Sequence, residues 1–182
     1  RRFTTAYYRT VTRKLESTRE MVNKFKIKLE KIQVDFESTL STSQEKVTLD
    51  GDPQHAGFQF RASNEVAESN SKDTYYIRPK EGRDKKALTK NWPKNKDMTN
   101  LSWKGQSIVV GGHRYTTLYL DHPSNPKPSY YSERDYGRFG SYFKSELTPL
   151  NDLNIRYRLL IGLKERNLKE CEEFSQNFVS TK

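Results

Sequence analysis

Apolar and polar residues alternate most regularly near the start of the chain. Lysines alternate with apolar residues over 24–29, and the alternation resumes at Ile32, Val34 and Phe36 after a slip of one residue. A period of two is typical of half-buried strands, and such a slip is typical of a β-bulge. Apolar residues spaced by four and three between Val11 and Phe36 also fit the seam of a coiled coil. Because threonine, β-branched and aromatic residues are frequent here, we predict strands and keep a helical coiled coil over 9–37 as the alternative.

Shorter stretches with strand character follow at close spacing. Gly111 and Gly112 lie between two of them, and paired glycines supply the positive φ angles of a tight hairpin turn. After Gly162, apolar residues recur at helical spacing up to Phe178 within a stretch rich in Glu and Lys, which predicts one C-terminal helix. We predict strands over residues 3–15, 47–49, 57–62, 74–78, 107–110, 114–120 and 154–161.

These elements predict an all-β fold, an antiparallel β-sandwich of supersandwich-like type with one C-terminal α-helix. The chain of 182 residues suits a single domain over 1–182. Because it begins Arg-Arg-Phe without Met, we expect that an N-terminal segment precedes it.

Two stretches interrupt the strand pattern. Lys80–Thr99 is basic and polar, and we interpret it as an excursion over the surface. Leu120–Gly140, LDHPSNPKPSYYSERDYGRFG, is rich in Pro, Ser and aromatic residues and has no apolar period. We predict a long ordered loop there, and long loops in compact domains are often functional.

The positive net charge of the chain is compatible with several kinds of acidic partner and does not select one of them. The formal net charge is +10, but the basic residues are spread along the chain beside 23 acidic ones. This distribution favours a generally solvated basic surface over a nucleic-acid interface. Cys171 is the single cysteine and lies on the apolar stripe of the predicted helix, so we expect it in the core. No apolar run approaches the ~20 residues that a membrane helix needs.

Histidines near strand ends are the first candidates for chemistry. His55 precedes the strand that delivers Arg61, and His122 follows Asp121 at the end of another strand, whereas His113 beside the glycine pair is an exposed turn residue. His55 and His122 either hold loops through backbone hydrogen bonds or meet a nearby acid in one site. Such a site would perform acid–base chemistry or bind a metal. No HxH or HExxH spacing occurs, so we assign no metal ligands.

Arginines and tyrosines are the second candidates. A guanidinium binds carboxylates or sugar hydroxyls with fixed geometry, and tyrosine rings offer a flat surface to a sugar. The same residues would alternatively brace the loop or form its own small core. The candidate ligand-binding residues are His55, Arg61, Arg78, Arg134, Tyr136 and Arg138.

The motif DHPSNP, with QHAGFQFRA before it and RYRLLIG after it, resembles the PmoA-type family of bacterial proteins. Asp121, His122 and Asn125 match the family's turn, and Tyr136-Gly137 matches its Tyr-Gly step. The resemblance runs from about Val47 to Ile161 and implies a mainly antiparallel β fold. It also implies an exported protein, periplasmic or secreted, associated with carbohydrate-processing genes. Gln54-His55 stands where family members often have two histidines.

We therefore expect a carbohydrate-related protein that binds or processes a sugar or glycan. Its cleft would lie between Leu120–Gly140 and the strand from His55 to Arg61, and His122 with Asp121 or Glu133 would transfer any proton. One alternative is a metal-dependent enzyme that uses His55, His122 and a carboxylate. Another is a nucleic-acid binder that uses the basic surface. No cofactor is assigned.

Overall fold

The computed structural model of the chain describes residues 31–52 and 54–180. The strands predicted over 3–15 and 24–29 lie outside the described residues, as does most of the coiled-coil alternative. The end of that alternative is wrong, because 31–40 form a strand in which Val34 and Phe36 are half-buried and Asp35 is exposed, as the alternation predicts.

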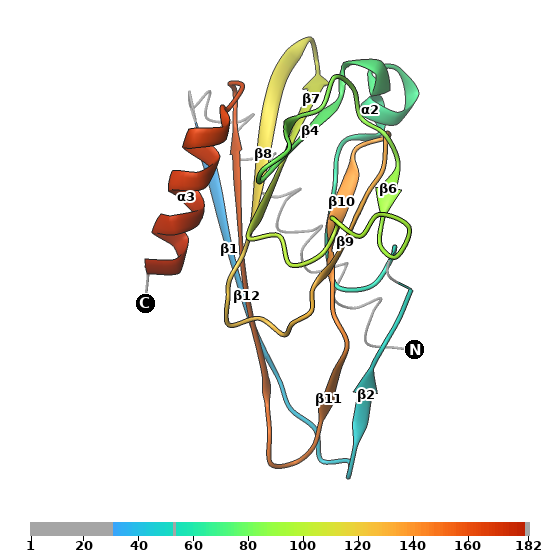
Figure 1. Cartoon of the computed structure of the whole chain (residues 1–182), viewed down its shortest axis with the longest axis vertical. Helices are drawn as coiled ribbons and strands as arrows, with labels where there is room; N and C mark the ends of the chain where they lie inside the picture. The colour runs from blue at the N-terminus through green and yellow to red at the C-terminus, as the bar shows by residue number, and fades with distance from the viewer. Residues whose placement is uncertain (1–30, 53, 181–182) are drawn as a thin grey trace. The chain divides into compact units, whose positions relative to one another are not determined.

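The described chain is mostly antiparallel sheet with one long helix at its C-terminal end, which confirms the predicted fold class (Figure 1). The strands form a six-stranded sheet in the order β1-β12-β8-β7-β4-β5, a four-stranded sheet in the order β3-β10-β9-β6 and a two-stranded sheet of β11 and β2. The strands are β1 Lys31–Leu40, β2 Val47–Leu49, β3 Phe58–Arg61, β4 Tyr75–Arg78, β5 Gly82–Arg83, β6 Lys90–Asn91, β7 Trp103–Val110, β8 His113–Asp121, β9 Tyr130–Glu133, β10 Arg138–Tyr142, β11 Ser145–Leu147 and β12 Leu153–Gly162. The helices are α2 Asn64–Glu68, the 3-10 turn η1 Ser71–Asp73 and α3 Leu168–Ser180.

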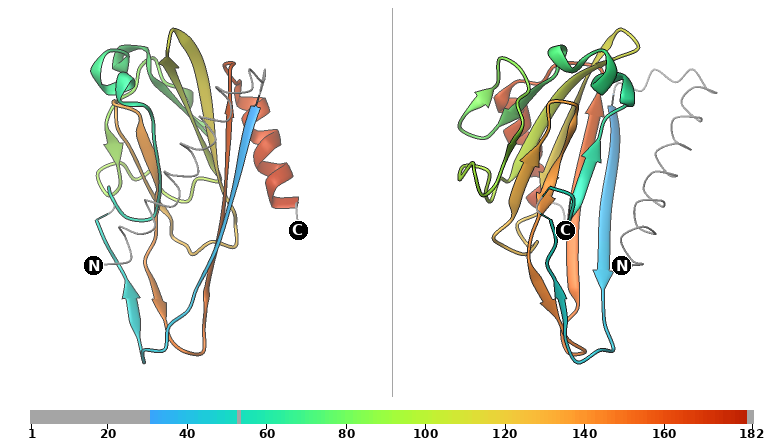
Figure 2. Two further views of the ribbon diagram at one scale, coloured as in Figure 1. Left: turned by 180° about the vertical axis from the view of Figure 1, so that it is seen from behind. Right: turned by 90° about the vertical axis from the view of Figure 1, so that its right-hand side faces the viewer.

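The six-stranded sheet is the middle layer, between α3 and the four-stranded sheet (Figures 1 and 2). It buries side chains on both faces. Successive side chains of a strand point to opposite faces. Tyr119 of β8 therefore packs toward the four-stranded sheet, while its neighbours Leu118 and Leu120 pack toward α3. The core between the sheets is largely aromatic and includes Phe58, Tyr76, Tyr119, Tyr131, Phe139 and Tyr157.

Helix α3 covers the other face of the six-stranded sheet. Its buried residues include Cys171 and Phe178, which confirms Cys171 as a core residue. Trp103 of β7 donates a hydrogen bond of 2.8 Å from its indole nitrogen to Glu172, which ties the helix to the sheet. The helix begins at Leu168, later than the spacing after Gly162 predicts. No helix in the described part of the chain is long and apolar enough to cross a membrane.

The predicted hairpin is confirmed, and two other predictions need correction. Gly111 and Gly112 join β7 to β8 with φ angles of 57° and 74°. The long loop predicted over Leu120–Gly140 instead contains β9 and the start of β10, which pair with each other. Likewise, the stretch Lys80–Thr99 contains β5 and β6 and buries Met98 completely, so it is not only a surface excursion.

Candidate functional site

Two distant segments of the chain meet where β3 pairs with β10. Phe60 lies opposite Phe139, and both rings pack into the core between the sheets. The next pair along the strands, Arg61 opposite Arg138, must therefore face away from that core. We call this side of the four-stranded sheet the outer face. The predicted proximity of the 55–61 strand to the second half of 120–140 is thus realised as a strand pairing.

The strand register arranges the outer face in three rows. The first row is the arginine pair Arg61 and Arg138. The second row is polar and crosses all four strands. The third is aromatic, with Tyr142 of β10 opposite Tyr130 of β9. The members of the polar row are Gln59, Gly140, Ser132 and Asn91.

Gly140 lies at the centre of the polar row, and no larger residue fits there. A Cβ atom at this position would lie 2.2 Å from the carbonyl oxygen of Phe58 and 2.8 Å from the Cδ atom of Gln59. The missing side chain lets β3 approach β10 closely and lets the Gln59 amide lie over the strand. Gly140 and Ser132 are buried, whereas Gln59 and Arg138 beside them are half-buried.

Several polar atoms of the outer face are buried and have no hydrogen-bond partner among the described residues. They are Nε and Nη2 of Arg138, Oε1 of Gln59 and Oγ of Ser132. The Gln59 amide is oriented by its Nε2, which donates to the carbonyl of Ala56 at 2.9 Å. Buried polar atoms are normally paired, and leaving one unpaired costs about 1–3 kcal/mol. A molecule that accepts from Arg138 and donates to Gln59 would satisfy these atoms.

The segment before β3 borders the outer face. Arg134, from the turn between β9 and β10, donates a hydrogen bond to the side chain of Gln54. His55 contacts the carboxylate of Asp52 through Nδ1 at 2.5 Å. The pKa of Asp52 is lowered by the backbone N–H of Gln54 and by His55, and also by the charge of Arg138. Asp52 therefore lies within electrostatic reach of the arginine row.

An aromatic ring lies near the arginine row. The guanidinium of Arg61 lies 5.9 Å from the centre of the Tyr136 ring. Five of the residues predicted from the sequence thus belong to this face or its border: His55, Arg61, Arg134, Tyr136 and Arg138.

Arg78 and Glu133 lie elsewhere, in a buried charge network between the two sheets. Arg78 donates to Glu133 at 2.7 Å, and the ammonium group of Lys104 forms an ion pair with the same carboxylate. Burial lowers the pKa of Lys104 to about 8 although Glu133 opposes that shift. Sequence reasoning missed Lys104 because it begins the strand at Ser107, whereas β7 begins at Trp103. The only sequence signal is a lysine next to a tryptophan ahead of an apolar run.

Asp121 and His122 point to opposite sides of the six-stranded sheet. Asp121 is buried and accepts hydrogen bonds from Tyr131 and Asn125, both at 2.7 Å. His122 lies on the α3 side, with its ring edge-on to Phe178 at 5.3 Å between centres. Glu133 is in the core between the sheets, so the expected proton transfer between His122 and Asp121 or Glu133 has no common site here.

The DHPSNP turn docks the end of β8 onto β12. Asn125 accepts from the backbone N–H of Arg156 and donates to the carbonyl of the same residue, both at 2.7 Å. The backbone N–H of His122 donates to that carbonyl at 3.3 Å. The motif therefore has a structural role in holding two strands together.

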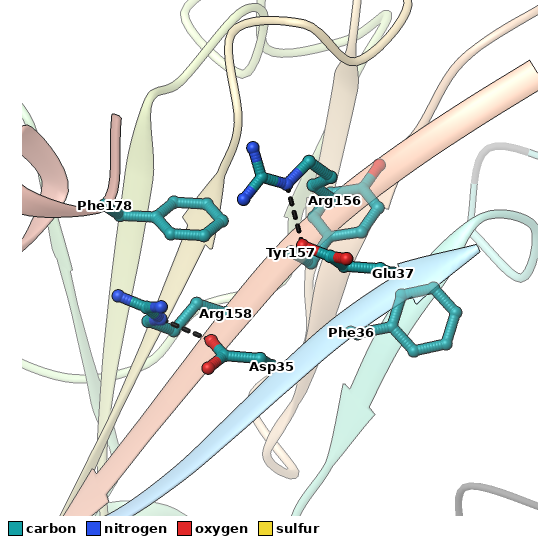
Figure 3. A pocket seen from close by; sticks show the side chains of 7 residues that line it. All are labelled: Asp35, Phe36, Glu37, Arg156, Tyr157, Arg158 and Phe178. Atoms are coloured by element: carbon teal, nitrogen blue, oxygen red, sulfur yellow. Dashed lines mark hydrogen bonds and ion pairs between the residues drawn. The ribbon is translucent and has the colours of Figure 1, made fainter. Parts of the chain in front are cut away.

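A small pocket of about 210 Å³ is lined by Phe178 of α3 and by residues of β1 and β12 (Figure 3). His122 contacts Phe178 of this lining. Arg156 pairs with Glu37 at 2.9 Å, and Arg158 pairs with Asp35. Nε2 of His122 lies 3.5 Å from Nη1 of Arg156. Burial and the charge of Arg156 lower the pKa of His122. The arginines of this pocket are therefore already neutralised by carboxylates of the neighbouring strand.

A second pocket of about 340 Å³ lies beside Arg78. It is lined by charged residues of both signs, among them Glu81, Lys96 and Asp97. Burial and contact with Asp97 raise the pKa of Glu81. Across the described residues, no group of three or more His, Cys, Asp or Glu side chains is arranged to hold a metal ion. The alternative of a metal-dependent enzyme required His55 and His122 in one site, and they lie in different layers of the fold.

Comparison with known proteins gives one match. The chain matches the model of a family of unknown function (DUF6807) over residues 9–175. No curated protein and no solved structure matches the chain significantly.

Proposed function

Because the chain belongs to the DUF6807 family, whose function is unknown, we propose a function from the site geometry: the outer face binds an acidic sugar. The observation that carries this proposal is the set of buried, unpaired atoms of Arg138, Gln59 and Ser132 on one sheet face. Arg61 lies directly beside Arg138 on the neighbouring strand and adds a second positive charge.

The unpaired atoms call for a ligand with both kinds of hydrogen-bonding group. The guanidinium of Arg138 only donates, so it requires an acceptor, and a carboxylate suits its planar geometry. Oε1 of Gln59 only accepts, so it requires a donor such as a hydroxyl. A sugar acid carries both groups on one ring, whereas a simple anion such as sulfate offers no donor to Gln59.

The proposed roles follow from the rows of the face. Arg138 and Arg61 hold the carboxylate, and Gln59 and Ser132 hold ring hydroxyls. Arg134 acts indirectly because its hydrogen bond to Gln54 fixes the segment that borders the face. This arrangement supports binding, and it assigns no residue to a chemical step.

Calorimetric titration with galacturonate and glucuronate tests the proposal, with galactose, glucose and sulfate compared at the same ionic strength. We expect the sugar acids to bind more tightly than the neutral sugars and sulfate. Arg138→Gln should weaken sugar-acid binding by at least tenfold, since a hydrogen bond to a charged group contributes about 1.5–3 kcal/mol.

Arg83→Gln is the matched control. Arg83 lies on β5 of the other sheet, its side chain is 57% exposed, and its removal takes away the same charge. It should leave the affinity unchanged. Equal losses in both variants would indicate a general charge effect, and no binding of any sugar acid would overturn the proposal.

A further inference from the structure

The aromatic row of the outer face is a feature that a single bound sugar acid does not use. Tyr130 stacks on Trp92 with 3.9 Å between ring centres and 26° between planes. The ring centre of Tyr142, the second neighbour of Tyr130, lies 5.8 Å from the ring centre of Tyr130. Three aromatic rings thus run from β10 across β9 to the residue that follows β6.

The three rings differ in what they leave accessible. Tyr142 is buried, and its hydroxyl donates to Asp50 at 2.6 Å, so its position is fixed. Tyr130 and Trp92 are half-buried, and Trp92 also packs against the core between the sheets. Tyr142 and Trp92 are thus the two ring neighbours of Tyr130, and Trp92 with Tyr130 forms the less buried end of the row.

The aromatic row lies on the same face as the arginine row, and the polar row separates the two. Arg138, Gly140 and Tyr142 alternate along β10 on the same face. At about 3.4 Å per residue, Arg138 and Tyr142 are about 14 Å apart along the strand. A single pyranose ring bound to Arg138 is too short to reach the aromatic row, whereas a second linked ring extends toward it across the polar row.

We infer that the outer face binds an acidic oligosaccharide of at least two rings, with one ring at Arg138 and the next over Trp92 and Tyr130. This inference rests on the proposed function. The carboxylated ring would satisfy the unpaired atoms of the polar row, and the second ring would lay its C–H face on the aromatic surface. Aromatic side chains favour such contacts because they combine a large apolar area with few rotatable bonds.

The test compares the affinities of digalacturonate and galacturonate by calorimetry. The ratio of the two affinities isolates the contribution of the second ring. For the unaltered protein we expect digalacturonate to bind about tenfold more tightly. Trp92→Leu and Tyr130→Leu should each bring the ratio close to one and leave galacturonate binding unchanged. Trp92→Phe keeps an aromatic ring and should keep most of the advantage.

The galacturonate affinity also reports whether each variant retains the folded face. If galacturonate binds and digalacturonate gains nothing, the second subsite is refuted while the proposed function stands. A gain that survives both leucine substitutions would refute it as well, because the second ring would then lie elsewhere. If neither ligand binds, the proposed function fails and the subsite fails with it.

Discussion

Arg78 donates a hydrogen bond of 2.7 Å to Glu133 in the interior between the two sheets, although 55 residues separate them in the chain. The side chains are 1% and 0% exposed, and Lys104, also fully buried, pairs with the same carboxylate. Removing these charges from water is costly, and the cost is offset only while each charge keeps its partner. The network therefore couples β4 and β7 of one sheet to β9 of the other.

Breaking this network should strongly destabilise the fold. Glu133→Gln removes the charge that neutralises Lys104 and leaves the ammonium group buried. We expect the free energy of unfolding to fall by about 3–5 kcal/mol in urea denaturation. Glu37→Gln is the control, because Glu37 is 67% exposed and pairs with Arg156 at the surface. Its replacement should lower the free energy of unfolding by less than about 1 kcal/mol. Equal losses in the two variants would show that the buried network stabilises the fold no more than a surface ion pair does.

Buried tyrosines should resist ionisation until the protein unfolds. Burial raises the pKa of Tyr76, Tyr119 and Tyr131, and the charge of Asp121 raises that of Tyr131 further. Because the unfolded chain ionises these phenols near their ordinary pKa of about 10, their stabilising contribution is complete below that pH and is lost above it. Absorbance at the phenolate band should therefore rise in two stages, the second together with the loss of circular dichroism. Complete titration of all tyrosines in the folded protein would contradict this.

His122 should make stability depend on pH in the weakly acidic range. Burial and then Arg156 lower its pKa, and Lys127 adds to this, against smaller opposing contributions from Asp121 and Glu37. When folding lowers the pKa of a histidine, its contribution to the free energy of unfolding is complete above the unfolded pKa of about 6.5. That contribution is lost as the pH falls below this value.

Two measurements check this prediction. NMR titration of the ring should give a midpoint below that of an unfolded peptide. In His122→Gln the stability should fall less steeply between pH 6.5 and pH 5. A midpoint at or above 6.5, or an unchanged slope in the variant, would count against it.

Gly140 should be intolerant of even one added carbon. Gly140→Ala would place Cβ 2.2 Å from a backbone oxygen of β3, so the paired strands would have to separate. We expect a loss of about 3 kcal/mol or more of unfolding free energy, at the upper end of overpacking effects. Gly82→Ala is the comparison, because its φ angle is +73° but nothing lies within 4 Å of the added atom. That variant should lose only about 1–2 kcal/mol. A similar loss in both would mean that β3 and β10 adjust without cost.

The period of apolar residues predicts the long strands well and the short ones poorly. β1 and β12 are ten residues long, and apolar residues alternate with polar ones over 32–36 and 153–159, which is long enough to distinguish the pattern from chance. β9 and β10 are missed because their inner positions include Glu133 and Ser141, which interrupt the apolar period that marks a strand. A charged residue is expected at the surface unless its partners are known. The partners of Glu133 are Arg78 of β4 and Lys104 of β7, which the sequence alone does not reveal.

The candidate site was partly predictable for a related reason. Arginine and tyrosine accumulate in the second half of 120–140, and His55 with Arg61 marked the upstream segment. Pairing of β3 with β10 brings Arg61 and Arg138 together. The side on which His122 lies follows from the register of β8, in which Asp121 takes the inner position. Gln59 and Ser132 carry no signal of their own in the sequence. Their importance arises from their neighbours, which only the tertiary structure supplies.

The alternation along β10 separates two kinds of selective pressure within five consecutive residues. Phe139 and Ser141 serve the interior, while Arg138, Gly140 and Tyr142 serve the opposite side. Under the proposed function, replacement of Arg138 would redirect recognition toward a different ligand without repacking the aromatic interior. Related chains that diverge in what they recognise should accordingly differ at position 138 and agree at Phe139, Gly140 and Ser141, where the packing leaves no room for change.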